Sequence, residues 1–179
     1  GGEMSRCSFV GEVYSQSHAG GLAGKALGGD GIHQCRAAGS VTAENLAGGL
    51  VGNHQALLED SYAQVDVSSL AGSFQHTGGI AGGCCRCGIR RVWAAGDVSG
   101  SDPAGLLPHF LCSEENVIED AFWDVDLSGL GADGETEASG AMGYSSEHMQ
   151  QEASYTNFDF DTVWRIAEGE DYPRLRWEL

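Results

Sequence analysis

Two short elements recur along the chain, and both alternate with a period of two, with small or apolar residues facing one way. The first element is a glycine-rich run around one or two aliphatic residues, and its copies begin at Gly20, Gly48 and Gly78. A degenerate copy begins at Ala104, so that successive copies are 28, 30 and 26 residues apart. Alternation with a period of two is typical of β-strands, and the pattern therefore predicts short strands rather than helices.

The second element is a run of seven residues that ends on an aliphatic side chain. Its copies end at Val13, Val41, Val67, Val98 and Leu127, which are 28, 26, 31 and 29 residues apart. Two different elements thus keep one period, which indicates a structural repeat of about 28 residues.

A repeat of this length predicts an all-β fold, a parallel β-helix or β-solenoid. At ~3.3 Å per residue, one repeat covers roughly 90 Å, which is enough for one coil with two or three short strands and their turns. Coils that stack at ~4.8 Å place equivalent residues above one another. A β-sandwich stays open as an alternative, and so does a β-propeller, although propeller blades need ~40 residues or more.

Stacking of the coils predicts three ladders of side chains, two facing inward and one, made of aromatic residues, facing outward. The first inward ladder consists of Val13, Val41, Val67, Val98 and Leu127. The second inward ladder consists of Leu22, Leu50, Ile80 and Leu106. The aromatic ladder consists of Tyr62, Trp93 and Phe122.

The clearest copies of the repeat are Ser61-Tyr62-Ala63 with Asp66-Val67, followed by Gly78-Gly79-Ile80-Ala81-Gly82. This pattern resembles the GLUG motif family, which is named for its Gly-Leu-aliphatic-Gly signature, and the resemblance covers roughly residues 5–130. GLUG repeats occur in large bacterial surface and secreted proteins, including adhesin-like chains and the non-catalytic part of immunoglobulin A-specific metallopeptidases. The resemblance implies an extracellular β-helical stalk or adhesive surface.

The chain is expected to divide into a repeat region, residues 1–130, and a C-terminal capping segment, residues 131–179. A solenoid needs a closing unit because its last coil exposes an apolar end and unpaired strand edges. The tail is similar to the segment that closes such arrays. Within it, residues 145–153 predict a short helix with Ser145 as its N-cap. The apolar residues suited to closing the array are Phe158, Phe160, Trp164, Tyr172, Leu175 and Trp177.

The repeat suggests how some of the six cysteines pair. Cys7 and Cys35 hold the same repeat position, so they should lie one above the other at ~4.8 Å, within the usual Cα separation of a disulfide. The spacing also places Cys112 next to Cys85 or Cys87, with Cys87 preferred. Such disulfides predict an oxidising compartment.

A metal site is the rival interpretation of the same cysteines. Cys84 to Cys87 offer soft ligands together with Cys112 and His76, but the chain lacks the pair of Cys-x₂₋₄-Cys hairpins that zinc usually prefers. A thiol nucleophile is disfavoured because no pattern of His–Asn or His–Asp partners accompanies these cysteines.

The formal charge of the chain is −17, and it is unevenly distributed. Residues 1–95 have a net charge of −1, whereas residues 96–179 have a net charge of −16. This acidity disfavours nucleic acid and anionic membranes as partners, since both are bound through Lys and Arg. No apolar run reaches the ~18 residues of a membrane span, so membrane insertion is not expected.

Three carboxylates are the candidates for a calcium site: Asp97, Asp124 and Asp126. Asp97 and Asp126 share the repeat position of Asp66, and in a solenoid this predicts an outward acidic ladder. A bound Ca²⁺ would relieve the repulsion between stacked carboxylates, and parallel β-helices that act on polysaccharides use similar clusters. The simpler interpretation is that these residues are solvated at outward positions.

No His-Glu-x-x-His, Gly-x-Ser-x-Gly or phosphate-loop motif is present, so no catalytic residue is assigned. The opening Gly1-Gly2-Glu3 carries no signal-peptide pattern, and we expect a mature fragment or the C-terminal piece of a longer chain. The expected function is a non-catalytic structural or adhesive module of a bacterial surface or secreted protein, with an extracellular protein or polysaccharide partner. No cofactor is expected, and calcium stays open as a candidate. Two alternatives stay open. One is a carbohydrate-active or polysaccharide-binding β-helix, and the other is a filament subunit that self-associates through its uncapped first coil.

Overall fold

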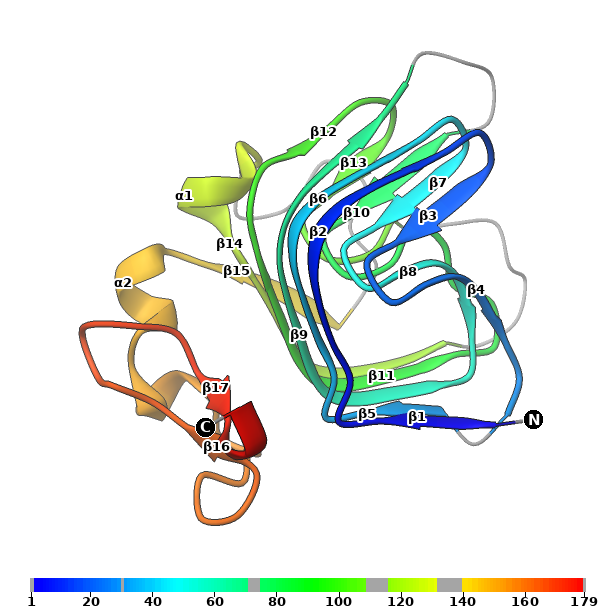
Figure 1. Cartoon of the computed structure of the whole chain (residues 1–179). Helices are drawn as coiled ribbons and strands as arrows, with labels where there is room; N and C mark the ends of the chain where they lie inside the picture. The colour runs from blue at the N-terminus through cyan, green and yellow to red at the C-terminus, as the bar shows by residue number, and fades with distance from the viewer. Residues whose placement is uncertain (1, 30, 71–74, 109–115, 132–139, 179) are drawn as a thin grey trace.

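In the computed structural model, the chain winds into a β-solenoid of about four coils with a C-terminal segment beside them (Figure 1). The structure describes residues 2–29, 31–70, 75–108, 116–131 and 140–178. The predicted β-solenoid is confirmed, because the strands of successive coils pair in parallel and in register. Within the described residues only two short α-helices interrupt the strands.

Each coil contributes strands at equivalent positions. The first coil contains β1 (Glu3–Ser5), β2 (Ser8–Ser15), β3 (His18–Gly20) and β4 (Ala23–Leu27). The second contains β5 (Gly31–His33), β6 (Arg36–Ala43), β7 (Leu46–Gly48) and β8 (Val51–Gln55). The third contains β9 (Leu57–Ser69) and β10 (His76–Gly78), and the fourth contains β11 (Gly88–Ala95), β12 (Val98–Ser99) and β13 (Pro103–Ala104). A fifth coil begins with β14 (Val117–Asp124) and breaks into α1 (Val125–Ser128).

The strand register confirms the first inward ladder over four coils. Val41 pairs with Val13 on one side and with Val67 on the other. Val98 pairs with Val67 in turn. The prediction that Leu127 is the fifth member of this ladder is wrong, because Leu127 lies in α1 and is 48% exposed. The reason is that the strand ends with β14 and a capped helical turn follows it.

The second inward ladder is confirmed as well. Leu50, Ile80 and Leu106 are fully buried. Their backbones are joined from coil to coil, because the Leu22 N–H donates to the Leu50 carbonyl, and the same bond recurs from Leu50 to Ile80 and from Ile80 to Leu106. These residues belong to the core cluster that fills the solenoid.

Glycine in the first element lets two walls of the solenoid meet. A Cβ on Gly49 would lie 2.7 Å from the Cβ of Ala63, and a Cβ on Gly79 would lie 2.9 Å from the Cβ of Ala94. Such separations are shorter than real Cβ contacts, so only glycine allows this approach. Glycine therefore faces alanine in successive coils, which explains why the two sequence elements keep the same period.

One corner of each coil is built from a non-glycine residue with positive φ, which follows β1 and β5 in the first two coils and lies within β9, β11 and β14 in the others. The five residues occupy one repeat position and have φ between 47° and 52°: Arg6, Gln34, Asp60, Arg91 and Asp120. This conformation is uncommon for residues other than glycine. Polar contacts between coils accompany it, since the Nε of Arg91 lies 2.7 Å from Oδ1 of Asp60 and the Nε of Arg6 donates to Oε1 of Gln34.

The C-terminal segment lies mainly along the side of the solenoid rather than over its end (Figure 1). Its first strand, β15 (Ala141–Tyr144), pairs with β14 and so covers that edge of the last coil. The remainder, residues 145–178, is called the strap here. It contains α2 (Ser146–Met149), a 3₁₀ turn η1 (Glu152–Ser154), β16 (Trp164–Arg165), β17 (Arg174–Leu175) and a second 3₁₀ turn η2 (Arg176–Glu178). The predicted helix is confirmed, with the Ser145 side chain accepting the His148 N–H at its N-cap.

The strap packs on the aromatic ladder and creates a second apolar core. Tyr62, Trp93 and Phe122 occupy paired positions in β9, β11 and β14, outside the core of the solenoid. The rings of Tyr62 and Trp93 stack with centroids 4.4 Å apart, and the strap residue Tyr172 stacks on Trp93 at 5.2 Å. The ladder faces out from the coils, as predicted, but the strap buries it almost completely.

Polar contacts tie the strap to several coils at once. At its far end, the Nε1 of Trp177 donates to the backbone carbonyl of Gln34 at 2.8 Å, which anchors it to the second coil. In the middle, the Nε1 of Trp164 donates to Asp60 of the third coil. Near its start, Asn157 donates to Asp120 of β14. The strap therefore braces the solenoid from the second coil to the beginning of the fifth.

The first coil is the least covered part of the solenoid. Val10 and Tyr14 of β2 are 67% and 61% exposed, and Leu27 of β4 is 59% exposed. Among the described residues, the strands of this coil pair with the second coil alone. The self-association expected through this end stays a prediction.

Candidate functional site

The three calcium candidates do not form the expected acidic ladder. Asp97 stacks on Asp66, whose Oδ1 accepts the Asp97 N–H at 3.0 Å, and both side chains are exposed. Asp126 lies in α1 instead of a strand, and its Oδ2 accepts the Ser146 N–H at 2.9 Å. The ladder prediction is therefore wrong beyond Asp97, because the fifth coil turns into a helix at this position.

Asp124 is fully buried and holds three structural elements together. Its Oδ1 accepts the N–H groups of Asp126 and Leu127, which makes it the N-cap of α1. Its Oδ2 accepts the hydroxyl of Ser146 in α2 at 2.6 Å and the hydroxyl of Tyr172 in the strap. The carboxylate thus has a structural explanation that requires no metal ion. In the part of the chain that the structure describes, no three His, Cys, Asp or Glu side chains form a group that could hold a metal ion.

Replacing Asp124 with alanine is expected to lower the free energy of unfolding by about 2 kcal/mol. The change removes a helix N-cap and leaves two buried hydroxyl groups without their charged acceptor. Urea unfolding monitored by circular dichroism measures the loss. The control is Asp97→Ala, an exposed carboxylate, which should change stability by less than about 0.5 kcal/mol. Equal effects of the two substitutions would contradict the structural role of Asp124.

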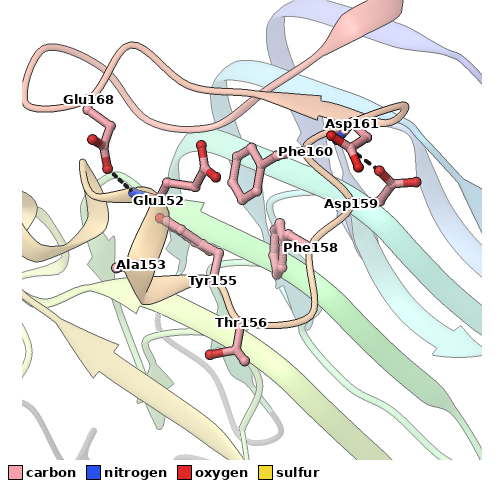
Figure 2. A pocket seen from close by; sticks show the side chains of 9 residues that line it. All are labelled: Glu152, Ala153, Tyr155, Thr156, Phe158, Asp159, Phe160, Asp161 and Glu168. Carbon is pink, nitrogen blue, oxygen red and sulfur yellow. Dashed lines mark hydrogen bonds between the residues drawn. The ribbon is translucent and has the colours of Figure 1, made fainter.

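The candidate binding site is a hollow in the strap, with a volume of about 680 Å³ (Figure 2). Three aromatic residues form one part of its lining: the ring centroids of Tyr155 and Phe158 lie 4.9 Å apart, and the ring of Phe160 lies 6.3 Å from that of Tyr155 and 6.4 Å from that of Phe158. Tyr155 and Phe158 are held in place by the second core, whereas Phe160 is half-buried. Thr156 and four carboxylate residues form the polar part of the lining; the carboxylates are Glu152, Asp159, Asp161 and Glu168.

Two of these carboxylates are already used to shape the hollow. Asp159 accepts hydrogen bonds from the hydroxyl and N–H of Thr162 and from the N–H of Asp161, and these bonds lower the pKa of Asp159. Glu168 accepts the Glu152 N–H at 2.9 Å and so joins the two sides of the hollow (Figure 2). A carboxylic general acid needs a raised pKa, so the shift at Asp159 is opposite to what acid catalysis requires.

A cluster of charged residues at the solenoid corner is a polar network that sequence reasoning missed. Glu59 accepts from Arg90 and Arg91 at 2.7 and 2.8 Å and lies 2.9 Å from Nδ1 of His33. Arg91 also binds Asp60 through two hydrogen bonds. Burial by itself would raise the pKa of Glu59, but the hydrogen bonds from Arg90 and Arg91 outweigh this effect, and the pKa of Glu59 is lowered. The network joins the second, third and fourth coils. The signal in the sequence was the shared repeat position of its members.

The cysteine predictions are corrected in part. Cys7 and Cys35 do lie on adjacent coils, as expected, and the Cys7 N–H donates to the Cys35 sulfur at 3.3 Å, but both thiols are free. Cys87 is bonded to Cys84 instead of Cys112, because the local turn brings their Cα atoms to 5.9 Å. Cys85 is disulfide-bonded as well. Cys112 lies outside the described residues, and its pairing with Cys85 stays a prediction.

His76, the candidate histidine ligand of the alternative metal site at Cys84 to Cys87, lies in β10, where its Nδ1 is 3.5 Å from Oδ2 of Asp102. Burial lowers the pKa of His76, while Asp102 partly offsets this effect.

The fold and the strap together define the chain as a β-solenoid repeat protein with a lateral C-terminal brace. No family model, curated protein or solved structure matches this chain. Among the described residues, no helix has both the length and the apolar character needed to cross a membrane.

Proposed function

We propose that this chain is a non-catalytic structural and adhesive module of a bacterial surface or secreted protein. The observation that carries the proposal is that its clustered polar side chains bond to other parts of the same chain. Asp124 joins α1 to two parts of the strap, α2 and Tyr172, and Glu59 with Arg91 joins neighbouring coils. These groups therefore stabilise the scaffold, and their hydrogen-bonding capacity is occupied by the protein itself. The GLUG resemblance of the repeat supports the same function.

The bracing of the solenoid supports a mechanical role. A stack of coils is held mainly by contacts between neighbours, so separate parts of the stack can open independently. The strap connects non-neighbouring coils, since Arg36 of the second coil pairs with Glu178 and Asp120 of β14 binds Asn157. A load applied to one coil is then shared by the others, as a stalk or an adhesive surface requires.

The charge of the surface limits the partner. Because the strap carries 8 Asp+Glu against 3 Lys+Arg, a net charge of −5, polyanionic chains are repelled from it at moderate ionic strength. The hollow combines aromatic rings with carboxylates, a combination that suits neutral or amino-bearing sugars and basic segments of proteins. The proposed partner is therefore a neutral or cationic extracellular polysaccharide, or an extracellular protein with a basic surface.

The test is retention of the purified chain on immobilised polysaccharides, together with an assay for new chain ends. Retention on a neutral or amino-sugar polymer, weaker retention on a polyuronate and no release of new reducing or unsaturated ends are expected. Asp161→Asn, with Glu147→Gln outside the hollow as the control, tests whether the strap hollow makes the contact. Cleavage of any polymer would instead favour the carbohydrate-active alternative. Failure to bind every polymer and every basic matrix protein tested would contradict an adhesive role.

A further inference from the structure

The free thiols of Cys7 and Cys35 lie one above the other at the junction of the first two coils. The Cys7 N–H donates to the Cys35 sulfur at 3.3 Å, and the Arg36 N–H donates to the Cys7 carbonyl at 2.9 Å. Each thiol also donates to the carbonyl two residues before it, that of Ser5 or that of His33, and these two residues pair with each other. The two cysteines therefore share one rung of the parallel stack, where a separation of ~4.8 Å lies within the Cα range of a disulfide.

The stacking that brings the two thiols together also makes a bond between them easy to break. Parallel strands in register hold equivalent Cβ atoms about as far apart as the strands themselves, ~4.8 Å, whereas a disulfide draws its two Cβ atoms to about 3.8 Å. Both side chains must lean toward each other when the bond forms, and this strains the rung. Strained disulfides are more easily reduced than structural ones. The pair is therefore suited to reversible oxidation rather than to a permanent cross-link.

The two sulfurs differ in their access to an external reagent. Cys7 is half-buried, whereas Cys35 is completely buried. Burial raises the pKa of Cys35 to about 11, and a side-chain hydrogen bond with Cys7 adds to this effect. A buried thiol of raised pKa is a poor first nucleophile. Thiol exchange with a solute therefore begins at Cys7, and Cys35 is the thiol that resolves the mixed disulfide.

The place of this pair in the fold shows what a bond between the two sulfurs would do. The end of the strap is fixed on both sides of Cys35, because Trp177 donates to the Gln34 carbonyl and Arg36 pairs with Glu178 at 3.2 Å. The strap braces the solenoid from the second coil onward, and the first coil is its least covered part. A bond to Cys35 would extend the bracing to the first coil.

We propose that Cys7 and Cys35 form a redox latch, a reversible disulfide that fastens the first coil to the second. The oxidant is a low-molecular-weight disulfide. The Cys7 thiolate attacks one of its sulfurs and releases one small thiolate, which leaves a mixed disulfide on Cys7. Cys35 then loses its proton to solvent, attacks the Cys7 sulfur and releases the second small thiolate. Two protein thiols thus become one disulfide, and the small disulfide is reduced to two thiols. The latch does not depend on the proposed function.

The first experiment equilibrates the full chain with mixtures of reduced and oxidised glutathione, blocks the remaining thiols by alkylation and digests the chain with trypsin. Cleavage after Arg6, Lys25 and Arg36 places Cys7 and Cys35 in separate peptides, so their disulfide is detected by mass spectrometry as a cross-linked peptide pair. The pair should form in excess oxidised glutathione and disappear in excess reduced glutathione. Its absence from every mixture, or its persistence in excess reduced glutathione, would overturn the proposal.

The second experiment measures what the latch does to the first coil. Hydrogen exchange of the β2 amides that pair with β6 is followed by nuclear magnetic resonance in the oxidised and the reduced chain. Oxidation should slow this exchange at least about tenfold, because a bond between residues 28 apart removes conformational entropy from the opened coil. Equal exchange rates in the two forms would show that the bond does not fasten the first coil.

The control is Cys35→Ser, which the chain itself shows to be tolerated at this repeat position. Ser61 follows Cys35 in the stack, and its Oγ accepts the Cys35 N–H at 3.0 Å, just as the Cys35 sulfur accepts the Cys7 N–H. The variant keeps Cys84 and Cys87, and its β2 amides should exchange at the same rate under both conditions. If oxidation slowed exchange in Cys35→Ser as much as in the wild type, the effect would come from other cysteines and the latch would be refuted.

Discussion

Replacing Gly49 with alanine is expected to lower the free energy of unfolding by about 3 kcal/mol, enough to unfold a large fraction of a marginally stable domain. The added Cβ would meet the backbone carbonyl oxygen of Gly79 and would lie 2.7 Å from the Cβ of Ala63. Neither neighbour is the end of a flexible side chain, so the two walls of the solenoid must separate. Chemical denaturation monitored by circular dichroism measures the loss.

The control for this prediction is Gly131→Ala. A Cβ on Gly131 would meet nothing within 4 Å, so the same chemical change should leave stability within about 0.5 kcal/mol of the wild type. If Gly49→Ala were as stable as Gly131→Ala, the glycine and alanine walls could not be in contact. The explanation of the glycine repeat would then be wrong.

Trp93→Ala is expected to cost about 3–5 kcal/mol and to release the strap. Trp93 is completely buried, stacked between Tyr62 at 4.4 Å and the strap residue Tyr172 at 5.2 Å. Removing the indole leaves a cavity at the contact between the strap and the solenoid. We therefore expect a loss of the near-ultraviolet circular dichroism signal and faster proteolysis within residues 145–178 than within the coils.

The control is Tyr14→Ala, in which the lost aromatic ring is 61% exposed and belongs to the first coil. This variant should keep the near-ultraviolet signal and the proteolytic resistance of the strap. If the strap of Trp93→Ala resisted proteolysis as well as the strap of the wild type, the aromatic ladder could not be the surface on which the strap packs.

The architecture of the coils was predictable because the same residue types return at one period. Val13, Val41 and Val67 stack in the structure as the spacing predicts, since parallel strands in register place equal repeat positions together. The prediction failed at Leu127, where the sequence repeat continues but the strand has already ended. Asp124 precedes it and caps a helical turn, and this local hydrogen bonding competes with strand pairing.

The position of the strap was not predictable from the tail alone. Its apolar residues show that it covers something, but the end of the last coil and the side of the coils are both apolar surfaces. The aromatic ladder decides between them, because Tyr62, Trp93 and Phe122 point away from the solenoid core and need a cover. Only the three-dimensional arrangement shows that the cover comes from the strap.

The cysteines and the corner network illustrate a different limit. Three cysteines within four residues allow a local pairing, and the turn at Cys84–Cys87 closes it at short range, which repeat spacing does not predict. At the corner, Asp60 and Arg91 occupy the same repeat position but have opposite charges. A comparison of repeats that looks for the same residue type at each position therefore does not find them. Their left-handed backbone and mutual ion pair become visible only in the structure.

The most direct test of the solenoid is a set of nuclear Overhauser contacts in the isotopically labelled chain. Parallel stacking in register predicts cross-strand contacts from the backbone of Val41 to both Val13 and Val67, and a contact from the indole of Trp177 to Gln34. Observation of all three would establish both the stacked coils and the strap that returns to the second of them. Contacts that instead join neighbouring strands as antiparallel hairpins, with Val41 remote from Val13, would contradict the account.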